Sequence, residues 1–197
     1  MRSALAILAL VPMLLAAEPR PQGVPSGRAL VVLEHELPTT LNPLYPQSEV
    51  DVRTSSAVFD RLFYRNPIGS TLRHRLVDRV ESLHGDEQRL RLTIEEGIRW
   101  HDGEAFSAQD ICFTVHTLAD PEQELPWEVA RYREWLDGCR VDKEGRAVIT
   151  FTRTFHNPLE RADFYVLPAH VFAESPPSPE HAFSKEPVGT GPMRARL

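Results

Sequence analysis

The sequence predicts a mixed α/β fold of the α+β kind, and three observations lead to this prediction. Leu90, Leu92 and Ile94 alternate with polar residues, and this period of two is typical of a strand with one buried face. Ser107 and Asp110 have the spacing of a capping box at the start of a helix. The 197 residues are 42% hydrophobic and 25% charged, which is an ordinary globular composition with enough apolar residues for one core or two small ones.

The N-terminal residues have the features of a secretory signal peptide. Arg2 supplies a positive charge, Ala4–Leu15 is apolar, and Ala16-Ala17 offers a cleavage site of small residues. We expect residues 1–17 to be the signal and residues 18–28, rich in proline and glycine, to be a flexible leader. No cysteine follows the apolar run, so a lipobox anchor is not expected, and the chain is predicted to be periplasmic or secreted.

The first half of the remaining chain is predicted to contain a strand, a helix, a hairpin and a second helix. Proline breaks the chain between the first strand and the first helix, and Gly85-Asp86 provides the hairpin turn. Asp120-Pro121 ends the second helix. In chain order these elements are a strand at Ala29–Glu34, a loop at Pro38–Pro46, a helix at Glu49–Leu62, a hairpin of Arg79–Leu83 with Arg89–Glu95, and a helix from Ser107 to about Leu118.

The second half is predicted to contain a second hairpin flanked by short helices. Asn157 is a candidate N-cap, because Pro158 then occupies the first helical position. Proline and glycine at Pro187–Pro192 indicate a rigid turn before a further strand. The expected elements are a helix at Trp127–Leu136, a hairpin of Cys139–Asp142 with Ala147–Thr152, a helix at Asn157–Phe164 and a helical turn within Leu167–Phe172.

Two cysteines, Cys112 and Cys139, lie on the predicted helix and at the start of a predicted strand. In an oxidising compartment they could form a disulfide, and the alternative is two buried thiols. Both alternatives remain open at this level, because only proximity in space decides between them.

Charge and motifs exclude several functional classes. The net charge of −6 and a pI of about 5.8 argue against a nucleic-acid partner. No metalloprotease HExxH motif or hydrolase GxSxG motif occurs, so we expect no enzyme, no metal and no cofactor. His101 is expected to be an exposed turn residue and Asp110 a helix-capping carboxylate. Gly189-Thr190-Gly191 lacks the lysine of a phosphate-binding loop, and a structural turn is expected there.

Several short motifs, in this order, resemble the N-terminal part of the family 5 extracellular solute-binding proteins, the oligopeptide, dipeptide and nickel receptors of ABC importers. Each motif is weak alone, whereas their joint order over about residues 29–193 is specific. The motifs are Leu41-Asn42-Pro43, Phe59-Asp60-Arg61-Leu62, Trp100-His101-Asp102-Gly103, Phe106-Ser107-Ala108-Gln109-Asp110, Pro168-Ala169-His170-Val171-Phe172 and Pro187-Val188-Gly189-Thr190-Gly191-Pro192.

This resemblance implies part of a type II periplasmic-binding-protein-like fold, with first-lobe strands and an inserted hairpin-and-helix subdomain. The implied organisation is a first-lobe segment at 29–48, the inserted subdomain at 49–185 and a return to the first lobe at 186–197. Family members are typically more than twice as long, so the second lobe would be missing. The implied function is capture of a peptide or related small solute for an ABC permease in the inner membrane.

The resemblance also selects candidate ligand contacts. Glu34, His35 and Glu36 follow the first strand and would face the crevice between lobes, where carboxylates can hold a peptide amino terminus. The alternative is that these three are solvated loop residues.

A second set of candidates lies on the predicted helix that precedes the second hairpin. Trp127, Arg131 and Tyr132, together with Trp135, could form an aromatic wall for a ligand, and core packing is the alternative.

Two other functions remain open. A nickel or haem site could pair His35 with His101 or His116, although the spacing gives it little support. A truncated family member could instead act as a secreted interaction or scaffold protein, because half a cleft would expose apolar surface to a partner.

Overall fold

The computed structural model describes residues 34–65, 72–83 and 88–197. The predicted signal peptide, the leader and all but the last residue of the strand at Ala29–Glu34 lie outside these ranges. By contacts the chain divides into Met1–Glu34 and His35–Leu197, and the second unit is described below. Within the described residues no helix is long and apolar enough to cross a bilayer.

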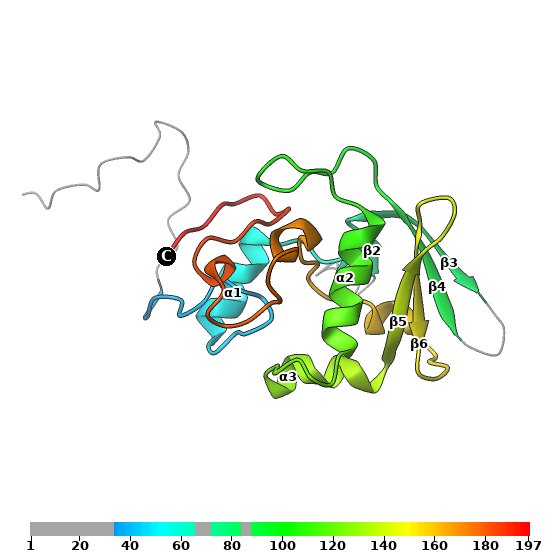
Figure 1. Ribbon diagram of the computed structural model, residues 1–197, viewed down its shortest axis with the longest axis horizontal. Helices are drawn as coiled ribbons and strands as arrows, with labels where there is room; N and C mark the ends of the chain where they lie inside the picture. Colours follow the sequence, from blue (N-terminus) through cyan, green and yellow to red (C-terminus); the bar gives the residue numbers. More distant parts are fainter. Residues whose placement is uncertain (1–33, 66–71, 84–87) are drawn as a thin grey trace, which may run out of the picture. The chain divides into compact units, whose positions relative to one another are not determined.

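The strand pairs of both predicted hairpins are confirmed, and they form one antiparallel sheet; the predicted turn at Gly85-Asp86 lies outside the described residues. The sheet consists of β3 (Val77–Leu83), β4 (Arg89–Ile94), β5 (Leu136–Val141) and β6 (Ala147–Phe151), in the order β3-β4-β6-β5 (Figure 1). Leu90 and Leu92 are fully buried, as the alternating pattern requires. The central pair β4 and β6 joins the hairpins, with Leu90 opposite Ile149.

The predicted capped helix is also confirmed and packs against this sheet. Helix α2 (Ala108–Ala119) begins after Ser107, whose backbone N–H donates to Asp110 Oδ2 at 2.8 Å in a reciprocal capping box. The helix lies against β5 and β6 (Figure 1), and its apolar residues Ile111, Val115 and Leu118 are buried. Of the two alternatives for the cysteines, the structure contains the disulfide between Cys112 on α2 and Cys139 on β5.

Helix α1 (Glu49–Val58) is shorter than predicted and ends four residues before Leu62. Its last carbonyls are used by a segment distant in sequence: Gly191 N donates to Val58 O at 2.9 Å and Met193 N to Ala57 O at 3.1 Å. The C-terminal segment, red in Figure 1, therefore lies beside α1. Leu62 is still fully buried, but it lies outside the helix.

The remaining helical segments are shorter than predicted. The helix predicted at Trp127–Leu136 is divided into α3 (Trp127–Ala130) and the 3₁₀ turn η1 (Arg131–Glu134), and it stops before Leu136, because that residue already pairs with β6. α4 (Pro158–Arg161) follows Asn157, whose side chain makes no capping hydrogen bond. Two further 3₁₀ turns are η2 (Ala169–Phe172) and η3 (Ala182–Ser184).

Two features differ from the sequence predictions. A small hairpin of β1 (Phe63–Arg65) and β2 (Leu72–His74) was not predicted, because three residues are too few for a visible period. The strand expected after Pro192 is absent from the described residues, and residues 193–197 form no ladder there.

Candidate functional site

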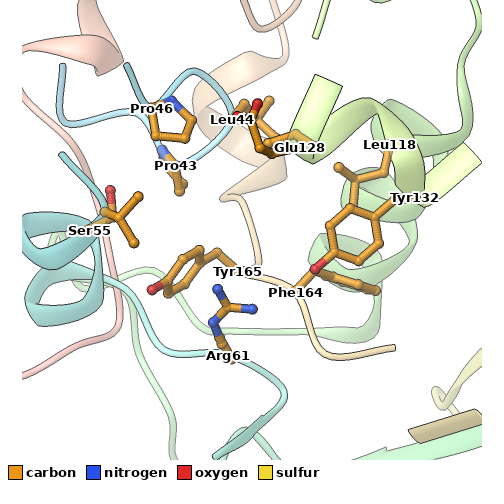
Figure 2. Close-up of a pocket in the computed structure, with 12 residues that line it drawn as sticks. Pro43, Leu44, Pro46, Ser55, Arg61, Leu118, Glu128, Tyr132, Phe164 and Tyr165 are labelled. Carbon is orange, nitrogen blue, oxygen red and sulfur yellow. The ribbon is translucent and has the colours of Figure 1, made fainter. Parts of the chain in front are cut away.

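The candidate site is a cavity of about 180 Å³ that six separate segments enclose (Figure 2). This volume suits a single large side chain or a small solute. The walls are mostly apolar, with one guanidinium and one carboxylate. The lining residues are Pro43, Leu44 and Pro46 from the loop, Val52 and Ser55 from α1, Arg61, Leu118 from α2, Glu128, Val129 and Tyr132 from α3 and η1, and Phe164 with Tyr165.

The loop wall is held by the buried side chain of Asn42. Its Oδ1 accepts from Leu44 N at 3.1 Å, which closes an Asx turn, and its Nδ2 donates to Ser184 Oγ at 3.4 Å. Leu41 N donates to Ser184 O at 2.8 Å. The Leu41-Asn42-Pro43 motif is therefore a turn that fixes Pro43 and Leu44 at the cavity.

Asp51 fastens the same loop to the first turn of α1. Its buried carboxylate accepts from Thr39 N at 2.7 Å, Thr39 Oγ1 at 2.8 Å, Thr40 N at 3.3 Å, Gln47 N at 2.8 Å and Ser48 N at 3.2 Å. Burial alone would raise the pKa of Asp51, but the bonds from Gln47 and Thr39 outweigh it and lower the pKa. The carboxylate is therefore ionised at neutral pH and organises this side of the site.

Arg61 and Tyr165 form the floor of the cavity. Figure 2 shows the Arg61 guanidinium beside the Tyr165 ring. Its Cζ lies 4.1 Å from the ring centroid, and the two residues also form an isolated β-bridge. Arg61 Nη1 donates to Asp163 O at 3.0 Å and is 3.8 Å from Asp163 Oδ2. Burial alone would lower the pKa of Arg61, but Tyr165 and Asp163 raise it overall. The guanidinium at the cavity is therefore charged, and the Asp163 carboxylate lies close to it.

Tyr132 forms the aromatic wall beside this floor. Its ring meets Trp135 at 5.4 Å and Phe164 at 6.0 Å between centroids, both edge-on, and its hydroxyl donates to Asp163 O at 2.8 Å. Burial raises the pKa of Tyr132, with Arg61 opposing, so the phenol remains a neutral donor. The wall is therefore rigid before any ligand arrives.

Among the predicted site residues in the second unit, only Tyr132 lines the cavity. Tyr132 lines the cavity, whereas Trp127 is 73% exposed and Arg131 stacks on Trp135, 5.5 Å from the ring centroid. His35 and Glu36 are exposed, with His35 Nε2 3.8 Å from Glu36 Oε1, and neither lines the cavity.

Glu34 is half-buried and belongs to the first of the two units. Its role as a ligand contact therefore stays a prediction, as do the roles of the other five candidates.

Sequence reasoning missed Arg61, Glu128 and Tyr165 as lining residues. Arg61 could have been found from the motif Phe59-Asp60-Arg61-Leu62. Glu128 could have been found because it directly follows the candidate Trp127. Tyr165 carried no signal, because its place in the cavity depends on a contact with Arg61 across about a hundred residues of chain.

His101 was expected to be an exposed turn residue; it does lie in a turn, but the expected exposure is wrong. Its ring is half-buried and holds the glycine turn, with Nδ1 accepting from Gly189 N at 3.2 Å and Nε2 2.8 Å from Gly191 O. The neighbouring Asp102 instead contacts His170, with Oδ2 2.7 Å from Nε2. Burial would raise the pKa of Asp102, but this partner lowers it overall.

Asp110 is a capping carboxylate, as predicted, and it also joins three segments. Besides capping α2, it accepts from Trp100 Nε1 at 3.3 Å and from Ala169 N at 2.9 Å.

Within residues 34–65, 72–83 and 88–197, no three His, Cys, Asp or Glu side chains are grouped as a metal ion would require.

Comparison with known proteins identifies the fold. The model of the bacterial extracellular solute-binding proteins, family 5 (middle region), matches residues 71–194. The oligopeptide-binding protein AppA of Bacillus subtilis, solved with a nonapeptide, has a TM-score of 0.65 at 19% identity, over 79% of this chain and 31% of AppA. NikZ of Campylobacter jejuni, solved with Ni(L-His), has a TM-score of 0.66 at 21% identity, over 82% of this chain and 31% of NikZ.

The chain is also similar to a curated protein. Protein XP55 of Streptomyces lividans is 27% identical over 173 residues, which cover 86% of this chain and 30% of that protein. The chain therefore spans about a third of the length of the proteins it matches. The fold is a partial type II periplasmic-binding-protein fold of mixed α/β class. Because the family model matches more than half of its residues, the chain belongs to the bacterial extracellular solute-binding proteins of family 5.

Proposed function

We propose that this chain belongs to the substrate-binding component of a peptide-type ABC importer and captures peptides, or a related small solute, for a permease in the inner membrane. The observation that carries the proposal is the family match over residues 71–194 together with the common fold with AppA, which was solved with a nonapeptide. The protein performs no chemistry on its ligand in this proposal, and it acts in the periplasm or outside the cell.

The cavity bounded by Tyr132 and Tyr165 receives one side chain of the ligand. Its walls are apolar and aromatic, and its volume of about 180 Å³ suits a leucine-sized or phenylalanine-sized group. Arg61 is balanced by Asp163 and gives the floor a fixed dipole and no excess charge. Glu128 is exposed at the cavity and supplies a carboxylate for a ligand amine.

The proposed domain organisation places this cavity at a junction. Pro43 and Leu44 lie in the proposed first-lobe segment 29–48, whereas Tyr132 and Tyr165 lie in the proposed subdomain 49–185. A second lobe, which this chain does not span, would close over the ligand by a hinge motion.

Isothermal titration calorimetry on the complete natural gene product tests the function. The titrants are a mixed peptide pool, then nickel with histidine, then haem. Saturable heat with the peptide pool is the expected result. Heat with nickel or haem alone would replace the peptide with that solute, and the absence of binding to all three would refute the proposal.

A further inference from the structure

Three arginines alternate with two aromatic rings on the surface formed by η1, α4 and the loop after β6. Arg131 Cζ lies 5.5 Å from the ring centroid of Trp135, and Arg161 Cζ lies 4.8 Å from the same centroid. Arg161 Cζ also lies 5.5 Å from the Phe155 centroid, and Arg153 Cζ lies 5.1 Å from it. We call these five residues the arginine ladder.

The rings of the ladder are fixed by bonds of their own. Trp135 is 7% exposed and its Nε1 donates to Arg161 O at 3.0 Å. Phe155 is held through its backbone by Gln88, whose Nε2 donates to Phe155 O at 3.0 Å and whose Oε1 accepts from Phe155 N at 2.6 Å. The rings therefore order the guanidiniums in advance, which lowers the entropy lost when they bind a partner.

The hydrogen-bonding edges of these guanidiniums are available. A guanidinium over an aromatic face is attracted by the π electrons of the ring, and this contact does not use the N–H donors of the guanidinium. Among the residues that the structure describes, none accepts a hydrogen bond from the side chains of Arg131, Arg153 or Arg161, and no carboxylate lies within ion-pair distance of them. This contrasts with Arg61, Arg91 and Arg146, which all have carboxylate partners.

We propose that the arginine ladder is a docking surface for a carboxylate-rich segment of a partner protein. Carboxylates match the planar fork of arginine in two-point hydrogen bonding, and arginine with tryptophan is the composition enriched at protein interfaces. The chain as a whole carries a net charge of −6. An acidic partner is attracted by this cluster of unpaired cations and repelled by the excess negative charge of the chain, so one orientation of the partner is preferred.

The observations favour a protein partner over a lipid surface. An aromatic anchor in a membrane must extend beyond the charges around it, whereas Trp135 is nearly buried and Phe155 is half-buried. This surface is separate from the ligand cavity, because none of the five ladder residues lines that cavity. Failure of peptide uptake would therefore leave this proposal intact, and the reverse also holds.

Fluorescence anisotropy of a labelled oligoglutamate peptide with the full chain tests the proposal. We expect saturable binding at low ionic strength that weakens as salt is added, and no binding of an oligolysine peptide. The double substitution R131Q/R153Q is expected to weaken oligoglutamate binding about tenfold or more, since it removes two charged donors and leaves the rings in place.

The matched control is R79Q/R140Q. Arg79 on β3 and Arg140 on β5 are exposed and lie outside the ladder, so this variant changes the net charge equally and should bind like the wild type. Thermal unfolding midpoints of both variants verify folding. Equal loss in both variants, or no oligoglutamate binding by the wild type, would overturn the proposal. Ladder-dependent binding to phosphatidylglycerol vesicles without peptide binding would overturn it in favour of a lipid surface.

Discussion

At the residue scale, single buried groups hold together segments that are distant in sequence. Asp51 joins residues 39–48 to α1, and Asp110 joins α2 to Trp100 and Ala169. Asp110 could be predicted because its capping partner is three residues away. Asp51 has the same spacing from Ser48 and also closes a capping box, whereas its bonds to Thr39 could not be predicted, because Thr39 lies twelve residues before it and no local pattern marks that pairing.

The substitution Asp51→Asn is expected to destabilise the fold by about 2–4 kcal/mol at neutral pH, because an amide cannot accept all the bonds that the carboxylate accepts. Urea unfolding at neutral pH measures this. Exposed Asp137 provides the control D137N, which should change stability by less than about 0.5 kcal/mol.

The lowered pKa of Asp51 predicts that the stability of the fold depends on pH. Because the folded-state pKa of Asp51 is lowered, its contribution is present above the unfolded pKa of about 3.9 and is lost as the pH falls through the folded pKa. The stability difference between wild type and D51N should therefore shrink between about pH 5 and pH 2. A difference that is constant over this range would contradict the account.

Gly189 is required by a close approach of two backbones. A Cβ at this position would lie 2.0 Å from Val58 O and 2.8 Å from Val58 C, which are backbone atoms that cannot turn aside. We expect Gly189→Ala to cost about 2 kcal/mol or more, measured by urea unfolding. Gly138→Ala is the control, because a Cβ there meets nothing within 4 Å. Equal effects of the two substitutions would show that the 187–192 turn is not packed on α1 as described.

At the scale of elements, local patterns predicted what local forces determine. The two hairpins and α2 follow from alternation, turn residues and a capping box, all of which act within a few residues. The end of α1 and the division of the helix predicted at Trp127–Leu136 could not be predicted. The first depends on hydrogen bonds from Gly191 and Met193, and the second on pairing of Leu136 with Phe151.

The disulfide between Cys112 and Cys139 joins α2 to β5 across 27 residues. A loop of this length is expected to contribute about 3.5 kcal/mol by restricting the unfolded chain. Urea unfolding with and without a reductant measures the difference, and the double variant C112S/C139S should be insensitive to the reductant. If the wild type has the same stability after a thiol assay shows complete reduction, the disulfide does not fasten the helix to the sheet.

At the scale of the whole molecule, the motifs predicted the family and the fold class, whereas the cavity had to be found in three dimensions. Tyr132 was a candidate from its position in an aromatic cluster, but the cavity requires six segments to meet. A linear sequence carries no direct sign of contacts such as that between Arg61 and Tyr165. The family resemblance supplied the order of the segments and left their side-chain geometry undetermined.

The central claim is that the cavity beside Tyr132 holds a side chain of the ligand, and filling the cavity tests it most directly. Val129 lines the cavity, so Val129→Trp should fill it, whereas Val141 lies on β5 outside it. Peptide titration by calorimetry is compared for the wild type, V129W and the control V141W, after thermal unfolding verifies that each is folded. The account predicts that V129W loses at least about tenfold in affinity and that V141W binds like the wild type. Undiminished peptide binding by folded V129W would contradict it.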